Sequence, residues 1–327
     1  MSTATEIGPS LSELVDRARG HDPHAVATLV SAFQDRREPA GARRQAVMSA
    51  LDSMAGRRDA VVIGITGAPG SGKSSLLARL TDELLRADAE LTLAVLAVDP
   101  SSPISGGALL GDRTRMRATT DPRLYFRSEA ADAELGGLSP SSFQVCRLLS
   151  RLFDCVVVET VGIGQSEADI RHLADHVYLV LAPLGGDELQ LMKAGITEIP
   201  DAFVVTKSDE PSSGRTHRQL CTSLWLARPA DGDSLPIFLT SARTGAGIGE
   251  LRGAVADQIA RGPVADRAAR DRYFLERWVK EEWGRAGLAH LHAALGGAGA
   301  ALERAGDLDA TAREFAKSFR RAIGTRS

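Results

Sequence analysis

Residues 67–74 of the 327-residue chain, GAPGSGKS, combine glycines with a lysine and a serine at the spacing G-x-x-x-x-G-K-S. Glycines allow a tight turn whose backbone N–H groups point inward and bind phosphate oxygens. At this spacing Lys73 reaches the terminal phosphates of a nucleotide, and the Ser74 hydroxyl ligates Mg²⁺. The nucleotide-binding residues predicted here are Gly67, Ala68, Pro69, Gly70, Ser71, Gly72, Lys73, Ser74 and Ser75.

The segments on either side of this loop support a phosphate-binding role. The apolar run VVIGIT, residues 61–66, predicts a strand before the loop, and KSSLLARLTDELLRA, residues 73–87, predicts a helix after it. The N-terminus of that helix adds positive potential where phosphates bind. A glycine-rich turn that matched by chance would not be expected between such elements. We therefore expect a nucleoside triphosphate with Mg²⁺.

A second segment indicates which base is bound. VVTKSD, residues 204–209, fits the guanine-reading pattern [NT]-K-x-D, with Thr206 where Asn is more frequent. The Asp209 carboxylate can accept hydrogen bonds from the ring N–H and the exocyclic amine of guanine, and adenine offers neither donor on that edge. The stem of Lys207 can cover the base. The sequence therefore favours GTP over ATP, with further support for the base expected from the backbone of Ser241, Ala242 and Arg243.

Acidic residues near strand ends are candidates for binding the metal. Glu159 and Gly162 belong to VETVGIGQSEADI, residues 158–170, where a carboxylate would face Mg²⁺ and the Gly162 N–H would meet the γ-phosphate. Asp112 lies in a loop rich in Gly, Ser and Pro that could order around Mg²⁺. From the residues alone, the less favoured alternatives are a capping role for Glu159 and a solvated loop carboxylate for Asp112.

The elements that must position these residues follow a regular alternation. Between residues 61 and 261, short apolar runs alternate with helical stretches, which predicts an α/β fold: a P-loop GTPase domain with a mainly parallel sheet between helices. We expect this domain at residues 59–262, an N-terminal helical extension at 1–58 and a C-terminal helical arm at 263–327. The predicted strands are 61–66, 91–98, 124–128, 155–160, 176–183, 201–207 and 236–242.

Composition narrows the class of protein. Hydrophobic residues make up 43% of the chain, charged residues 25%, and the formal net charge is −3, so no basic excess points to a nucleic-acid or membrane surface. We find no signal-peptide pattern and no apolar run of the roughly 18 residues that a membrane span needs. The three cysteines match no zinc pattern. These features favour a cytoplasmic protein with no membrane or nucleic-acid partner.

Three segments together resemble one family, the methylmalonyl-CoA-mutase-associated GTPases (MeaB/ArgK family). They are VDPSSPISGGALLGDRTRM at residues 98–116, VETVGIGQSEADI at 158–170 and GGDELQLMKAGI at 185–196. The first and third are not general GTPase motifs, which makes the resemblance specific. It runs from about residue 60 to residue 260.

This resemblance implies a GTPase chaperone for adenosylcobalamin-dependent acyl-CoA mutases such as methylmalonyl-CoA mutase, which gates cofactor loading and protects or reactivates the mutase. It also implies that Asp99, with Ser74, Asp112 and Glu159, binds Mg²⁺ beside GTP or GDP. Gln190 and Lys193 match residues thought to move toward the nucleotide when the mutase is engaged. The expected catalytic residues are Lys73, Glu159, Gln190 and Lys193, and the resemblance implies a homodimer formed through C-terminal helices.

Alternatives remain open on the residues alone. A kinase of a small acceptor would need an acceptor pocket and a general base, and no motif indicates either. A nickel-type metallochaperone GTPase would carry Cys/His clusters, whereas His172 and His176 form only a pair four residues apart. A scaffold that binds nucleotide without hydrolysing it would release no phosphate even with its partner. Because no glutamine neighbours Gly162, we expect slow intrinsic hydrolysis that a partner accelerates.

Overall fold

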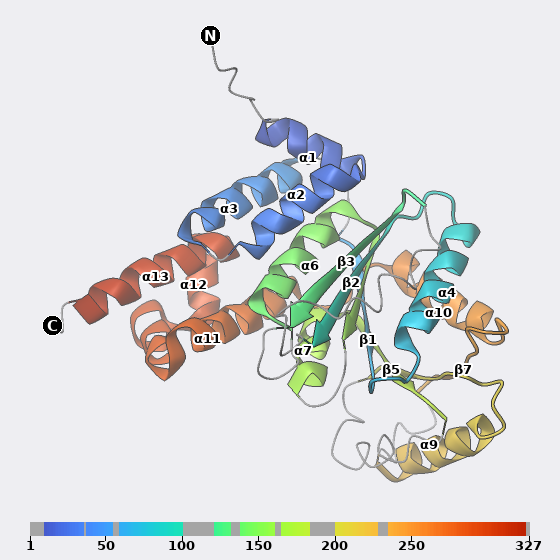
Figure 1. The fold of residues 1–327 in the computed structure, drawn as a ribbon. Helices are drawn as coiled ribbons and strands as arrows, with labels where there is room; N and C mark the ends of the chain where they lie inside the picture. The colour runs from blue at the N-terminus through green and yellow to red at the C-terminus, as the bar shows by residue number, and fades with distance from the viewer. Residues whose placement is uncertain are drawn as a thin grey trace. The chain divides into compact units, whose positions relative to one another are not determined.

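The computed structural model describes residues 10–35, 37–54, 59–100, 121–131, 138–160, 165–183, 200–227 and 235–324. The chain divides into two compact units (Figure 1). Unit 1 combines Met1–Arg57 with Asp266–Ser327, and unit 2 is Arg58–Ala265. The predicted N-terminal extension and C-terminal arm thus fall in one unit, although they lie at opposite ends of the sequence.

The described part of unit 2 contains a seven-stranded sheet with the order β3-β2-β4-β1-β5-β6-β7. Its strand pairings are all parallel, which confirms the predicted sheet type. In a parallel sheet the carboxyl ends of the strands lie along one edge, so the loops that follow them share that edge. The strands are β1 (Val61–Thr66), β2 (Leu93–Pro100), β3 (Leu124–Ala131), β4 (Cys155–Thr160), β5 (His176–Leu181), β6 (Ala202–Val205) and β7 (Ile237–Leu239).

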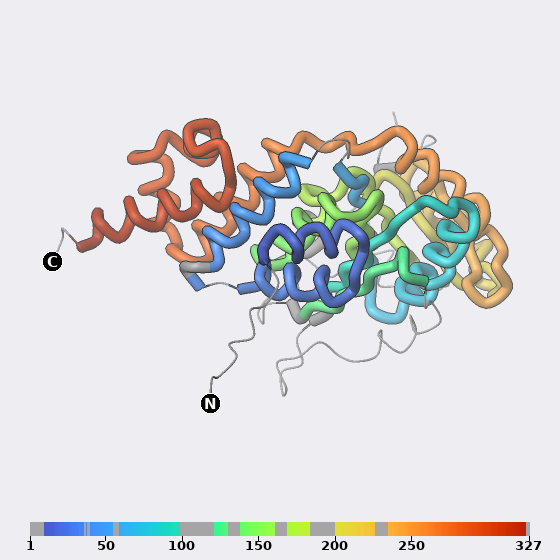
Figure 2. The backbone as a smooth tube through the Cα atoms, turned by 90° about the horizontal axis from the view of Figure 1, so that it is seen from above, coloured from blue at the N-terminus to red at the C-terminus, as the bar shows by residue number. Residues whose placement is uncertain are grey.

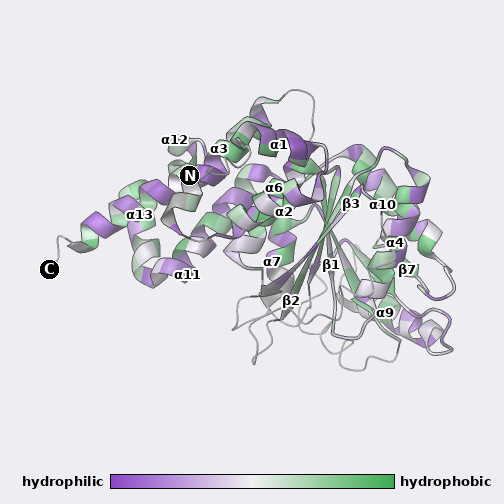
Figure 3. Ribbon diagram, turned by 45° about the horizontal axis from the view of Figure 1, so that its top comes forward, coloured by the Kyte–Doolittle hydropathy of each residue, from purple (hydrophilic) through white to green (hydrophobic). Residues whose placement is uncertain are grey.

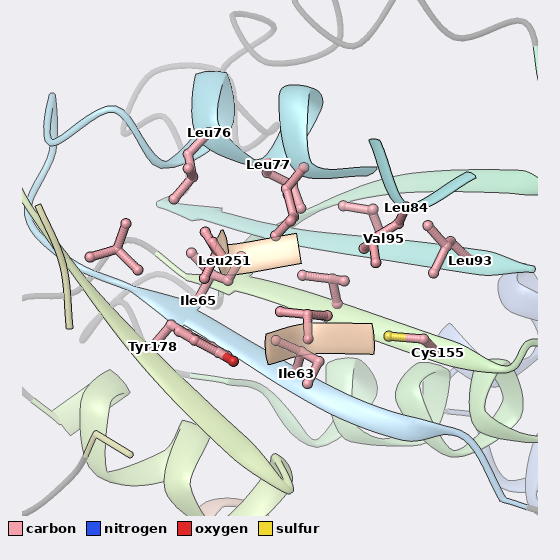
Figure 4. Close-up of a cluster of buried hydrophobic side chains, with 14 of the residues drawn as sticks. Ile63, Ile65, Leu76, Leu77, Leu84, Leu93, Val95, Cys155, Tyr178 and Leu251 are labelled. Atoms are coloured by element: carbon pink, nitrogen blue, oxygen red, sulfur yellow. The ribbon is translucent and has the colours of Figure 1, made fainter. Parts of the chain in front are cut away.

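One face of the sheet is covered by α4 (Lys73–Ala87) and α10 (Ile248–Arg261). Figure 4 shows Leu76, Leu77 and Leu84 of α4 pointing toward the strands. Their partners include Ile63 and Ile65, which alternate along β1 and therefore face the same side. Because Leu77 is completely buried, replacing such a leucine by alanine costs about 2–5 kcal/mol of folding free energy. This packing fixes α4 against the strand that precedes the phosphate loop.

The opposite face is covered by α6 (Pro140–Leu152), α7 (Gln165–Leu173) and α9 (Ser213–Ala227). Gly64 of β1 lies under α7: a Cβ atom at this position would come within 2.8 Å of the Ile170 side chain. Further along the sheet, Leu179 and Phe203 pack with Leu220 of α9 in a second apolar cluster. Both faces are apolar, as expected for strands buried between two helical layers.

Unit 1 consists of helices from both ends of the chain. In Figure 2 the blue α3 and the red α13 belong to this unit, and the two helices are in contact. A salt bridge of 2.7 Å from Arg44 Nε to Asp309 Oδ1 joins them, and Asp309 is 1% exposed. The helices are α1 (Leu11–Arg19), α2 (Pro23–Gln34), α3 (Glu38–Ser53), α11 (Arg267–Leu295), α12 (Gly297–Ala305) and α13 (Leu308–Gly324).

Aromatic packing holds the C-terminal helices of unit 1 together. Phe315 and Phe319 of α13 stack with their ring centroids 5.8 Å apart, and Trp283 of α11 meets both rings edge-on. Figure 3 shows that α13 carries both hydrophobic and hydrophilic residues, and its buried side includes these phenylalanines. Among the described residues, no helix is long and apolar enough to cross a membrane.

Candidate nucleotide-binding site

The phosphate loop joins the end of β1 to the first turn of α4. Gly67, Gly70 and Gly72 all have positive φ angles, of 147°, 78° and 92°. A Cβ atom at Gly67 would lie 2.2 Å from the backbone oxygen of Val180, so only glycine fits there. Pro69 and Gly70 form the exposed tip of the loop. Gly72 is the N-cap of α4, which directs the N-terminus of that helix at the loop.

Lys73 lies inside the curve of this loop. Its Nζ donates hydrogen bonds to the backbone oxygens of Gly67 at 2.7 Å and of Ala68 at 2.8 Å, and the residue is 5% exposed. A buried ammonium group costs desolvation energy that these carbonyl contacts offset. The loop therefore holds a positive charge beside its own backbone N–H groups, an arrangement that would suit terminal phosphates. The phosphate-binding role of Lys73 stays a prediction.

Ser74 and Glu159 are brought together from different elements. Ser74 is in the first turn of α4, and its Oγ donates to Oε1 of Glu159 at 2.8 Å. Glu159 is near the end of β4, opposite Ile65 of β1, and is 4% exposed. Two neighbouring ligands at about 2.1 Å from an octahedral Mg²⁺ lie about 3 Å apart. The donor types and spacing of this pair thus fit a magnesium site.

Asp99 belongs to the same edge of the sheet. It lies on β2 two residues beyond Ala97, which pairs with Glu159 of β4. The side chain of Asp99 is outside the described structure, as are Asp112 and Gly162 entirely. The same holds for Gln190 and Lys193. Their roles remain predictions.

The guanine-reading segment follows β6. Thr206 donates from Oγ1 to the backbone oxygen of Ser71 at 2.5 Å, which links this segment to the phosphate loop. Lys207 has a positive φ of 50°, an unfavourable conformation for a residue with a side chain. The Ser208 N–H donates to the Thr240 oxygen at 2.9 Å and so joins this segment to the one after β7. Thr206 in place of Asn therefore has a definite structural use.

Asp209 receives side-chain donors from the segment that follows β7. Its Oδ1 accepts a hydrogen bond from Ser241 Oγ, and its Oδ2 accepts bonds from Nε, at 3.0 Å, and Nη2 of Arg243. The Ser241 hydroxyl and then the Arg243 guanidinium lower the pKa of Asp209. The carboxylate is therefore charged at neutral pH and acts only as an acceptor. From the sequence, only the backbone of residues 241–243 was expected near the base. The structure adds contacts from the Ser241 and Arg243 side chains to Asp209.

Three buried hydroxyls lie near the phosphate loop, and of these only Ser71 was named from the sequence. Thr66 Oγ1, Ser71 Oγ and Thr160 Oγ1 have no hydrogen-bond partner among the described residues. They lie in or next to the phosphate loop and at the end of β4. Buried hydroxyls without a partner are costly, so their concentration here is consistent with a site for a polar ligand. For Thr66 and Thr160, only their position at the ends of β1 and β4 could have indicated a role.

The His172–His176 pair does not extend into a metal site within the described residues, where no group of three or more His, Cys, Asp or Glu side chains is placed so that it could hold a metal ion. Burial lowers the pKa of both histidines. Asp175, which lies between them, accepts hydrogen bonds from the backbone N–H groups of Val62, Val264 and Ala265. Its carboxylate therefore anchors β1 and the end of unit 2.

Comparison with known proteins agrees with this geometry. A family model described as methylmalonyl Co-A mutase-associated GTPase MeaB matches residues 25–284. The chain belongs to this family. It is a P-loop GTPase, a GTP hydrolase that binds guanine nucleotides, as the resemblance found in the sequence implied.

Individual relatives of this GTPase extend the comparison. A protein of Pyrococcus horikoshii that is named as a GTPase is 41% identical over 246 residues, which cover 74% of this chain and 75% of the relative. A Caenorhabditis briggsae protein named methylmalonic aciduria type A homolog, mitochondrial, is 38% identical over 53% of this chain and 43% of its own length. The crystal structure of an LAO/AO transport system kinase aligns with a TM-score of 0.59 at 23% identity, over 89% of this chain and 88% of that one, and shows the shared fold.

Proposed function

We propose that this GTPase is a chaperone for an adenosylcobalamin-dependent acyl-CoA mutase such as methylmalonyl-CoA mutase, and that it gates cofactor loading and protects or reactivates the mutase. The observation that carries the proposal is the family match over residues 25–284, which spans all of unit 2. The name of the Caenorhabditis briggsae relative points to the same metabolic setting. The identity of the client mutase stays open among the acyl-CoA mutases.

The proposed reaction is hydrolysis of GTP by water. The water oxygen bonds to the γ-phosphorus, and the bond from that phosphorus to the β–γ bridging oxygen breaks, which yields GDP and phosphate. Lys73 would exchange its carbonyl contacts in the loop for the terminal phosphate oxygens, whose charge it neutralises. Ser74 and Glu159, together with Asp99 and Asp112, would hold Mg²⁺, which supplies further positive charge to the phosphates.

The polar segment GGDELQLMK, residues 185–193, would couple binding of the mutase to the nucleotide site. In this account the mutase binds better to the state in which Gln190 and Lys193 lie against the nucleotide, and so it shifts the population toward that state. Lys193 would then add a positive charge to the transition state. The Gly162 N–H would meet the γ-phosphate. A homodimer formed through the C-terminal helices, a cytoplasmic location and the absence of membrane or nucleic-acid partners complete the proposal.

The chaperone role can be tested by following a purified adenosylcobalamin-dependent acyl-CoA mutase as it loses activity during turnover. With GTP and the wild-type chain, we expect the mutase to remain active longer. Lys73→Ala removes the phosphate-binding ammonium and should give no protection, while far-UV circular dichroism shows that it is folded. If wild type and Lys73→Ala affect the mutase equally, the proposed GTP-dependent chaperone role is wrong. That outcome would leave the assignment as a GTPase untouched.

A further inference from the structure

The Arg243 guanidinium is hydrogen-bonded to the Asp209 carboxylate, the same group that is expected to bind the guanine base. Its Nε and Nη2 both donate to Oδ2 of Asp209. The two N–H groups of a guanidinium edge point in parallel, just as the ring N–H and the exocyclic amine do on the edge of guanine. Arg243 therefore presents to Asp209 the same kind of paired donor that guanine presents.

The acceptor capacity of Asp209 does not allow both partners. Each carboxylate oxygen has two lone pairs, and Arg243 directs two donors at Oδ2. Ser241 Oγ donates to Oδ1 and leaves one lone pair on that oxygen. Guanine that bridges the carboxylate needs one lone pair on each oxygen. The Ser241 contact can persist when guanine binds, whereas the guanidinium must leave Oδ2.

We propose that Arg243 competes with guanine for Asp209 and thereby weakens the binding of guanine nucleotides. The inference rests on Asp209 being the guanine-reading carboxylate. Within the described residues, Asp209 is the hydrogen-bond partner of the Arg243 side chain. That side chain is 77% exposed, so it has little packing to lose when it swings into solvent.

The size of the effect of Arg243 on nucleotide affinity follows from the solvent exposure of the Arg243–Asp209 pair. The Asp209 side chain is 18% exposed, but its ion-pair partner is mostly in solvent, so screening keeps the pair weak. Exposed pairs of this kind change an equilibrium by about two- to fivefold. Arg243 thus tunes affinity and favours release of GDP without blocking the site. Salt that screens the pair should reduce the difference that Arg243 makes.

The test compares wild type, Arg243→Ala and Arg252→Ala by isothermal titration calorimetry. Arg252→Ala removes the same charge from α10 and is the matched control. GDP probes the whole site, and inorganic pyrophosphate probes the phosphate loop alone. We expect Arg243→Ala to lower the Kd for GDP by about two- to fivefold and to leave pyrophosphate binding unchanged. Arg252→Ala should not lower the Kd for GDP in this way. Unchanged or weaker GDP binding by Arg243→Ala would overturn the proposal.

A double-mutant comparison separates this inference from the assignment on which it rests. Asp209→Asn should weaken GDP binding and spare pyrophosphate, and adding Arg243→Ala to it should have no further effect on GDP. If Asp209→Asn leaves GDP binding intact, the guanine assignment itself fails. If Asp209→Asn weakens GDP binding but Arg243→Ala still strengthens it by the same factor in both backgrounds, competition at Asp209 is the part that fails.

Discussion

The hydroxyl of Ser74 donates to Oε1 of Glu159 across 2.8 Å and joins the first turn of α4 to the end of β4. The two residues are 85 positions apart in sequence, yet the parallel pairing of β1 with β4 brings them to one edge of the sheet. Both oxygens are hard ligands of the type that Mg²⁺ prefers. This contact is the described part of the proposed metal site.

Removing one of these oxygens should weaken metal binding. For Glu159→Ala we expect the Mg²⁺ concentration that gives half-maximal GTP hydrolysis to rise about tenfold or more. The measurement is phosphate release as a function of Mg²⁺ concentration at saturating GTP. Glu83→Ala removes a half-buried carboxylate of α4 that pairs with Arg79 and Arg86, and serves as the control. An unchanged Mg²⁺ dependence in Glu159→Ala would exclude Glu159 from the metal site.

Base recognition should depend on Asp209. In Asp209→Asn an acceptor oxygen is replaced by a donor that faces the donors of guanine, so the Kd for GDP should rise roughly 30-fold or more. Binding of ADP, measured by the same calorimetric titration, should change little. Wild-type protein that binds ADP as tightly as GDP would contradict the guanine assignment.

The charge of Asp209 predicts a pH dependence. The Ser241 hydroxyl and the Arg243 guanidinium lower its pKa below the ordinary value of 3.8. The charged form of Asp209 is therefore favoured in the folded state. Its contribution to folding stability is fully present above the unfolded pKa and is lost as the pH falls through the lower folded pKa. The ratio of the GDP Kd values of Asp209→Asn and wild type should stay constant from about pH 8 to pH 5. A ratio that collapses near pH 6 would contradict this.

The sequence predicted the sheet and the order of its motifs well. The strands at 61–66 and 155–160 match β1 and β4 because both runs are largely apolar on both faces. Other runs matched less well at their ends: of the predicted strand at 236–242, only Ile237–Leu239 is a strand. Just beyond this strand, Thr240 donates its N–H to the Val205 oxygen and accepts the Ser208 N–H, so its contacts are made with the segment that ends and follows β6.

Contacts between distant segments could not be read from local patterns. Asp22 caps α2 and Pro23 is the first residue of that helix, and both choices follow from local sequence because capping is a local effect. By contrast, nothing in the pattern of residues 1–58 indicates that Arg44 meets Asp309, 265 positions away. The Arg243–Asp209 pair is likewise a product of tertiary packing, in which β6 and β7 place their following loops side by side.

Breaking the buried ion pair of unit 1 should be costly. Asp309→Ala leaves Arg44, whose side chain is 15% exposed, without its charged partner, and we expect a loss of about 3 kcal/mol in the free energy of unfolding of unit 1. Glu314→Ala breaks an exposed pair on the same helix and should cost less than about 1 kcal/mol. Urea unfolding followed by tryptophan fluorescence distinguishes the two. Equal losses would mean that the Arg44–Asp309 pair does not hold the terminal helices together.

The central claim is that GTP hydrolysis by this chain is coupled to a mutase, and phosphate release with and without a purified adenosylcobalamin-dependent acyl-CoA mutase tests it most directly. We predict slow hydrolysis alone and a stimulation of about tenfold or more by the mutase, equivalent to about 1.4 kcal/mol of barrier. Lys193→Ala should keep the slow basal rate and lose most of the stimulation. If stimulation survives in Lys193→Ala, segment 185–193 is not the coupling element; if no such mutase stimulates the wild type, the claim is contradicted.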